Sequence, residues 1–92
     1  MSITSSQIDR CVIIASKFGA KRLLLFGSAV ESPETARDLD IACDGVDGWK
    51  LFELGASMEE EIGMPVDIVP LEPTTRFTRY IAKKGRLVYE AQ

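Results

Sequence analysis

The sequence predicts a small α/β (α+β) domain, in which helices pack on a mixed β-sheet. Two observations lead to this prediction. Short apolar runs bounded by glycine or proline alternate with longer segments whose apolar residues recur at helical spacing. The 92 residues, 46% of them hydrophobic and 27% charged, are enough for one core and too few for two. We therefore expect a single domain over residues 1–92.

The N-terminal half predicts one helix and two strands. Ser5 or Ser6 can cap a first helix, and Gly19 is well placed to end it. Residues 21–26 form a short apolar run typical of a buried strand, and residues 39–43 alternate as a second strand does. Two Asp-Gly pairs then predict a turn. The apolar positions of the first helix that fall on one side are Ile8, Cys11, Val12, Ala15 and Phe18.

The C-terminal half predicts two more helices and two more strands. A helix is expected over residues 49–62, followed by a strand over residues 66–69 that lies between two prolines. Thr74 or Thr75 can cap a third helix, which Gly85 ends. A short last strand follows at 87–89. The positions at helical spacing in the second helix are Phe52, Gly55 or Ala56, and Glu59 or Ile62; in the third helix Phe77, Tyr80 and Ile81 are expected to face inward.

The composition excludes several classes of protein. No histidine is present, which rules out the serine triad and most zinc hydrolases. Cys11 and Cys43 lie in apolar segments without a Cys-x-x-Cys motif, so we expect buried free thiols in a cytoplasmic protein. No apolar run is long enough to cross a bilayer, and the first residues do not resemble a signal peptide. No membrane association is expected.

The charge is small overall but unevenly distributed. A formal net charge of −3 argues against a dedicated nucleic-acid-binding protein, so we expect contact with nucleic acid only through a partner. Residues 76–86 nevertheless contain five cations and no acid. This stretch is either the ordinary polar face of the third helix or a contact for a partner protein, and residues 49–52 are a second candidate contact.

Three aspartates occupy positions that a sheet usually fills with apolar residues. Asp38 and Asp40 are two residues apart, so in a strand both carboxylates would lie on one face. Asp67 stands alone inside an apolar strand, where both propensity and desolvation disfavour it. Neighbouring carboxylates repel unless a cation lies between them, and hard oxygen ligands suit magnesium. If the two strands are neighbours, the three acids form one metal site.

A glycine and a serine, Gly27 and Ser28, follow the first predicted strand. Glycine allows a phosphate to approach the backbone, and the serine can offer its N–H and its hydroxyl to phosphate oxygens. Taken alone, this pair is also typical of a simple turn, and the Asp-x-Asp motif is also typical of a surface turn. Their combination with Asp67 favours a site that binds both a metal and a phosphate.

Residues 25–28 (Leu-Phe-Gly-Ser), 38–41 (Asp-Leu-Asp-Ile) and 66–69 (Val-Asp-Ile-Val), in this order, resemble the nucleotidyltransferase superfamily of DNA polymerase beta. Within it the chain is most similar to the minimal nucleotidyltransferase (MNT) domains, over about residues 21–89. The resemblance implies the nucleotidyltransferase fold and a site that takes ATP with magnesium (Mg2+). The implied roles are phosphate binding by Gly27 and Ser28, metal binding by Asp38, Asp40 and Asp67, and activation of the attacking hydroxyl by Asp67.

The chain departs from the family in the loop after Ser28. Family members commonly have an arginine there, whereas this sequence has Ala29, Val30 and Glu31. Arginine would complement the triphosphate charge, so the nucleotide site is weaker on sequence alone. Arg37, which precedes the paired aspartates where serine is frequent, either restores some positive charge or pairs with an acid.

Stand-alone MNT proteins typically pair with a HEPN protein, a ribonuclease toxin, and act as its antitoxin. The resemblance implies transfer of AMP from ATP to a tyrosine of that partner, with acceptor binding supplied by the second chain. An alternative is a catalytically weak or inactive module that neutralises a HEPN partner by binding alone. A third hypothesis is a catalytic subunit for a small-molecule or nucleic-acid acceptor.

Overall fold

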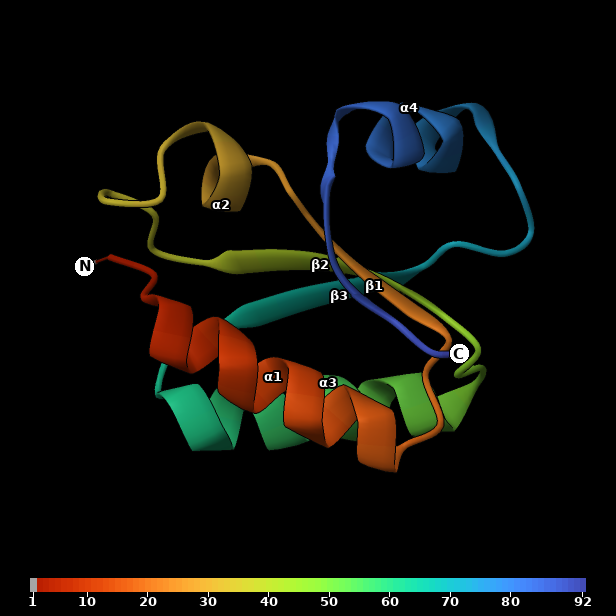
Figure 1. The fold of residues 1–92 in the computed structure, drawn as a ribbon, viewed down its shortest axis with the longest axis horizontal. Coiled ribbons are helices and arrows are strands. Elements are labelled where there is room, and N and C mark those ends of the chain that lie inside the picture. Colours follow the sequence, from red (N-terminus) through yellow and green to blue (C-terminus); the bar gives the residue numbers. More distant parts are fainter. Residues whose placement is uncertain (1) are drawn as a thin grey trace.

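Helices and strands alternate through residues 2–92, the part of the chain that the structure, a computed structural model, describes (Figure 1). The order resembles the prediction, with one added helical turn after the first strand. The elements are α1 (Ser5–Lys17), β1 (Arg22–Phe26), α2 (Ser28–Glu31), β2 (Leu39–Asp44), α3 (Trp49–Ile62), β3 (Val66–Pro70), α4 (Arg76–Lys84) and β4 (Arg86–Glu90).

The strands form one mixed sheet in the order β3-β2-β1-β4. β1 pairs antiparallel with both β2 and β4, whereas β2 pairs parallel with β3. The α/β (α+β) class and the mixed sheet are therefore confirmed. The two strands that carry Asp40 and Asp67 are direct neighbours, which is the arrangement that the predicted site requires.

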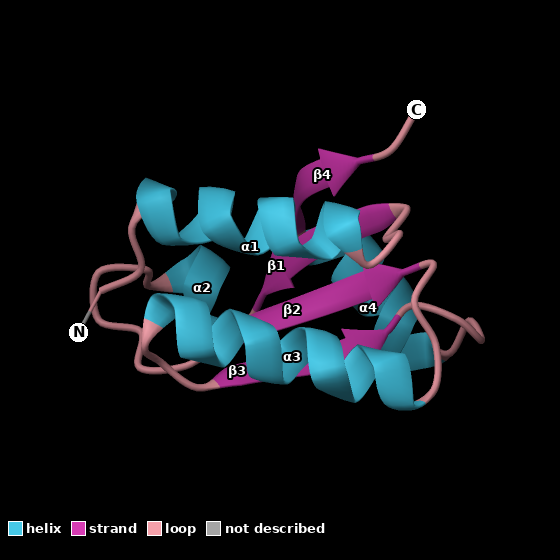
Figure 2. Cartoon of the chain, turned by 90° about the horizontal axis from the view of Figure 1, so that it is seen from below, coloured by secondary structure: helices cyan, strands magenta, loops and turns pink. Residues whose placement is uncertain are grey.

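The two faces of the sheet are covered unequally. α1 and α3 run side by side across one face, and α4 lies on the other; α2 lies at the end of β1, where its Ala29 packs into the cluster beneath α1 and α3 (Figures 1 and 2). The larger core cluster lies beneath α1 and α3, and a smaller cluster of Leu24, Ala42, Leu71 and Ile81 lies beneath α4. Alternation along β2 explains this division, because Leu39 and Ile41 join the larger cluster while Ala42 joins the smaller one.

The helix caps agree with the sequence except at the first helix. Thr4, rather than Ser5 or Ser6, caps α1, because its hydroxyl accepts the Gln7 N–H at 3.1 Å while the Gln7 side chain accepts the Thr4 N–H at 2.9 Å. This reciprocal pair satisfies two of the free donors at the start of the helix. Thr75 caps α4 in the same way, as predicted.

The predicted apolar positions of α3 and α4 are correct only in part. In α3 the buried residues are Leu51, Leu54, Gly55, Met58 and Ile62, whereas Phe52 is 83% exposed. In α4 only Thr78 and Ile81 are buried, whereas Phe77 and Tyr80 are exposed. The smaller cluster beneath α4 accommodates only a narrow stripe of that helix, so its large aromatic side chains lie at the margin or in solvent.

Both cysteines are free and buried, as predicted. Burial raises the pKa of the Cys11 thiol to about 11, and Glu61 adds to the effect. Burial likewise raises the pKa of the Cys43 thiol to about 11, with a contribution from Asp44. Among residues 2–92 no helix combines the length and the hydropathy that a membrane span needs.

Candidate nucleotide and metal site

The parallel pairing of β2 and β3 brings two of the predicted acids together. Asp40 lies directly opposite Asp67 in the register, and on its other side Asp40 pairs with Phe26 of β1. Residues paired across neighbouring strands share a face of the sheet. Both carboxylates therefore lie on the face that α4 covers, at the end of β1 from which α2 begins.

Asp38 precedes the same end of β2, but it does not lie in the strand as predicted. It lies in a bend directly before β2 rather than in the strand, so strand alternation does not fix its side chain. Asp38 is exposed, Asp67 is exposed, and Asp40 is partly buried between them. The structure thus makes Asp40 the centre of the three acids.

Asp40 is affected by burial and by the charges of the other two acids. Burial raises the pKa of the Asp40 carboxyl above its usual value, and the negative charges of Asp67 and then Asp38 raise it further. No ion pair within residues 2–92 involves any of the three, since the pair found there joins Arg22 to Asp44 at 3.5 Å. The acids repel one another without a neutralising side chain, and a bound cation would relieve this repulsion.

Gly27 connects the acids to the end of β1. Its φ is +64°, a conformation that favours glycine, and a Cβ at this position would lie 2.5 Å from Oδ2 of Asp40. The Asp40 carboxylate therefore occupies the space that any other side chain at position 27 would fill. The glycine-serine turn therefore lies against one of the three predicted carboxylates, that of Asp40.

Ser28 begins α2 and is exposed. The first turn of this short helix is held by the Gly27 carbonyl, which accepts hydrogen bonds from the N–H groups of Val30 and Glu31, each at 3.0 Å. Ala29 is buried in the larger core, so its small side chain anchors this turn. α2 contributes no cation, because its remaining residues are Val30 and the exposed Glu31.

The donors present fit a magnesium ion in kind. Magnesium commonly takes one or two carboxylates and completes its shell with waters and substrate phosphates, so a complete cage of protein ligands is not required. In the side-chain positions observed, no group of three or more acidic, histidine or cysteine residues within residues 2–92 is gathered closely enough to hold a metal ion. The central Asp40 with either exposed neighbour would supply the two carboxylates.

Two features of this region were not found by sequence reasoning. The ring of Phe77 in α4 meets that of Phe26 edge-on, with centroids 5.8 Å apart, which fixes α4 beside the site. Arg86 pairs with Leu25, two residues before Gly27, and therefore lies on the face of the larger cluster, opposite the carboxylates. The sequence placed Arg86 in a basic stretch, but only the pairing of β4 with β1 shows its place at this end of the sheet.

A comparison with models of protein families identifies the family to which the chain belongs. The model of the family described as polymerase beta, nucleotidyltransferase, matches residues 10–92. The chain belongs to this family. The predicted family and fold are confirmed, and the matched range contains the glycine-serine turn and all three aspartates. A search of curated protein sequences finds no match.

Solved structures show the same nucleotidyltransferase fold. The chain is similar to a chain of a toxin–antitoxin structure with AMP-PNP, at 18% identity and a TM-score of 0.76, covering 98% of this chain and 76% of that one. It is similar to a chain of a tri-AMPylated Shewanella oneidensis HEPN toxin in complex with MNT antitoxin, at 17% identity and a TM-score of 0.76, covering 98% and 75%. A third neighbour is a chain of the MntA–HepT toxin–antitoxin, at 17% identity and a TM-score of 0.75, covering 97% and 74%.

Proposed function

We propose that this nucleotidyltransferase-family chain transfers AMP from ATP to the hydroxyl group of a tyrosine in a HEPN-type toxin. By this modification the chain acts as the antitoxin of that toxin. The observation that carries the proposal is the contact between the Asp40 carboxylate and Gly27, with Asp67 opposite Asp40. This contact would place acidic metal ligands directly beside a turn that can approach phosphate. The structural neighbours with AMP-PNP and with an AMPylated HEPN toxin support the choice of nucleotide and partner.

In the proposed reaction Gly27 and Ser28 bind the β- and γ-phosphates, which leaves the α-phosphate over Asp40. Asp67, exposed on the edge strand, is open to an incoming hydroxyl and accepts its proton. The acceptor oxygen forms a bond to the α-phosphorus while the bond to the β-phosphate oxygen breaks, and pyrophosphate leaves. Asp38, Asp40 and Asp67 would hold magnesium, which when bound neutralises the charge of the phosphates and activates both oxygens.

The test is transfer of label from α-labelled ATP, with magnesium, to the protein encoded by the neighbouring gene, which we expect to be of the HEPN type. We expect labelled toxin, with the label on tyrosine. Asp40→Ala should lower the rate at least about a hundredfold, because it removes the central ligand. Asp44→Ala is the matched control, since Asp44 lies on the same strand four residues away and pairs with Arg22 outside the site. A D44A rate as low as that of D40A would contradict the proposal.

The second candidate function is neutralisation by binding alone. The observation that favours it is the absence of any cation in α2 together with the exposed Glu31. An Asp38→Ala, Asp40→Ala double variant separates the two functions. If the wild type leaves the toxin unlabelled and the double variant still neutralises it fully, binding alone is the function. If the double variant loses neutralisation, transfer is required.

A further inference from the structure

The register arranges the carboxylate face of the sheet in two rows that run across the strands. The residues of the first row, at the end of β1 that leads into α2, are Phe26, Asp40 and Asp67. The residues of the second row, two positions back along β1, are Leu24, Ala42 and Val69. All three residues of the second row belong to the small cluster that contains Ile81 of α4. α4 therefore lies on the second row, directly beside the row that carries the acids.

The proposed reaction restricts the direction in which the nucleoside extends from the α-phosphate. In an in-line displacement the attacking and leaving oxygens lie on opposite sides of the phosphorus. With the acceptor at Asp67 and pyrophosphate at Gly27, this line would follow the first row, with Asp40 between them. The nucleoside is attached through a third oxygen, so it would extend to one side, either over the second row toward α4 or past the strand ends. The following inference rests on the proposed function, since it concerns how the same site holds its nucleotide.

α4 presents an aromatic ring on its side of this line. Phe77 lies in the first turn of α4, and its ring meets that of Phe26 edge-on, with centroids 5.8 Å apart. Phe26 is paired with Asp40, the central acid. The segments past the strand ends, residues 27–38 and 63–65, contain no aromatic residue. Phe77 thus lies at the border between α4 and the row of acids.

Packing alone does not explain the aromatic residues of α4. Phe77 is 52% exposed, and Tyr80, one turn further along the helix, is 57% exposed. The two rings leave adjacent aromatic surface in solvent, which marks a contact for a ligand or a partner. Nucleic-acid bases stack on such surfaces, and every base has a face that can stack. We propose that Phe77 stacks on the base of the bound nucleotide and holds the nucleoside against α4.

Two other exposed aromatic residues serve as the rival and the control. Tyr80 lies farther around the helix from the buried stripe of α4 than Phe77 does, so it is the rival surface for the base. Phe52 is 83% exposed and belongs to α3, which covers the opposite face of the sheet. Phe52 is therefore a matched control of the same residue type, remote from the row of acids.

The test compares two ligands that have three phosphate groups each, only one of which carries a base. Binding of AMP-PNP and of inorganic tripolyphosphate, both with magnesium, is measured by calorimetry for the wild type, Phe77→Leu, Phe77→Trp, Tyr80→Leu and Phe52→Leu. Phe77→Leu keeps an apolar side chain against Phe26 but removes the aromatic face. It should weaken AMP-PNP about fivefold or more and tripolyphosphate less than about twofold, because stacking concerns only the base. Phe77→Trp should retain AMP-PNP binding, and the Tyr80 and Phe52 variants should change neither ligand.

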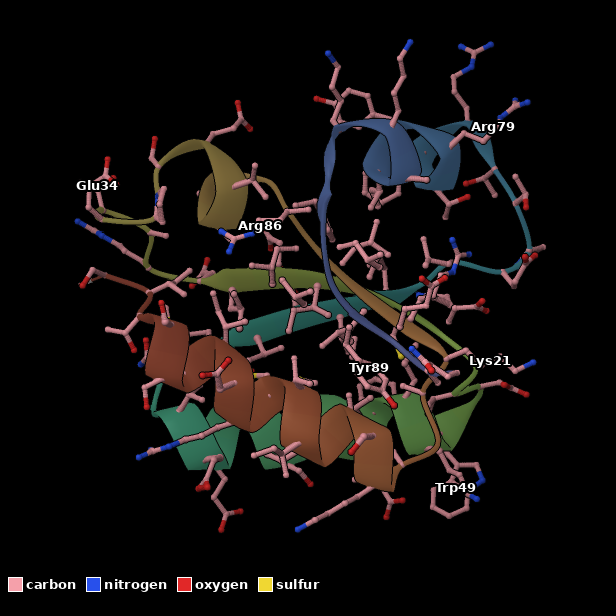
Figure 3. All side chains as sticks on the ribbon, in the orientation of Figure 1. Lys21, Glu34, Trp49, Arg79, Arg86 and Tyr89 are labelled. Atoms are coloured by element: carbon pink, nitrogen blue, oxygen red, sulfur yellow. The ribbon has the colours of Figure 1, made fainter. Side chains whose placement is uncertain are left out.

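The Phe77→Trp variant gives a second readout, which a purely structural role would not change. An indole that stacks on a base is quenched, so AMP-PNP should lower the fluorescence of this variant and tripolyphosphate should not. Trp49 is the only tryptophan of the wild-type chain, and Figure 3 shows it on the α3 side of the molecule, away from α4. Wild-type fluorescence should therefore stay constant with either ligand. Thermal melting checks that each variant is folded.

Several results would overturn the inference and leave the proposed function intact. Unchanged AMP-PNP binding by folded Phe77→Leu removes it outright, and so does constant fluorescence of Phe77→Trp on binding AMP-PNP. Equal weakening of both ligands would show that Phe77 acts on the shape of the phosphate site through Phe26. Selective weakening by Tyr80→Leu alone would assign the base to Tyr80. Failure of the folded wild type to bind AMP-PNP would instead remove the proposed function and this inference together.

Discussion

The two faces of the sheet are built for different purposes. The face beneath α1 and α3 is closed by long helices over a continuous apolar cluster, and it holds both buried cysteines. The opposite face has only a small apolar cluster beneath α4, beside three acids that no side chain within residues 2–92 neutralises by an ion pair. The first face contributes most of the stability, and the second carries unfavourable charge next to the Gly27-Ser28 turn. Stability is therefore separated from the site by the thickness of one sheet.

The largest effect is expected when the two faces of the sheet are compared through two neighbouring residues of β1. Leu23 is fully buried in the larger cluster, and Leu24 is buried in the smaller one on the opposite face. Both substitutions remove the same atoms. Leu23→Ala should cost about 3–5 kcal/mol and Leu24→Ala about 2–3 kcal/mol, because the thin layer beneath α4 can close over a cavity more readily. Urea denaturation of each variant measures the free energy of unfolding.

An equal or larger loss for Leu24→Ala would contradict the comparison, since the small cluster would then be as important as the large one. A change in the urea m-value of either variant would instead indicate that the denatured or native state had changed in compactness. The two variants are informative as a pair because strand position, residue type and burial are nearly matched.

A second test separates backbone strain from the function of the site. Gly27 (φ +64°, ψ −141°) and Gly48 (φ +62°, ψ −140°) have almost the same conformation, and each precedes a helix. Nothing lies within 4 Å of a Cβ on Gly48, whereas a Cβ on Gly27 would displace the Asp40 carboxylate. Each alanine variant should lose about 1–3 kcal/mol from the shared strain, because the Asp40 side chain can turn away.

Only Gly27→Ala should also lose AMP transfer, since the displaced carboxylate is the central one. Stability by urea denaturation and transfer of labelled AMP are measured on the same two proteins. Loss of transfer in both variants would mean that strain alone disrupts the site. Full transfer by Gly27→Ala would show that close approach of Gly27 to Asp40 has no catalytic importance.

Much of this arrangement was predictable from local patterns. The strand that contains Asp67, the helix that begins at Trp49 and the end of α4 at Gly85 all follow from short-range signals such as proline, glycine and apolar spacing. The sequence alone did not predict that Asp40 lies opposite Asp67. It predicted a shared site only if the two strands were neighbours, because strand order depends on contacts between distant segments. The exposure of Tyr80 was missed for the same reason, since helical spacing identifies an apolar stripe but not how much sheet lies beneath it.

The smallest expected effect concerns the cost of the acids themselves. Asp40→Asn removes a partly buried charge that Asp67 and Asp38 repel, so it should stabilise the metal-free protein at pH 7. We expect a rise in Tm of roughly 2–4 °C, measured by thermal melting with EDTA. Asp44→Asn is the control on the same strand, and it should not stabilise, because Asp44 pairs with Arg22.

The pH dependence gives this prediction a definite sign. The pKa of Asp40 in the folded chain lies above the ordinary value of 3.8, so between these two values the folded chain binds more protons than the unfolded chain. The contribution of Asp40 to wild-type stability therefore falls as the pH rises through this window and stays at its least favourable above it. The advantage of Asp40→Asn should be complete at neutral pH and should disappear as the pH is lowered toward 3.8. If Asp40→Asn is more stable than the wild type by the same amount across this window, the asparagine acts through packing. If it remains more stable in saturating magnesium, the cation does not relieve the repulsion among the acids.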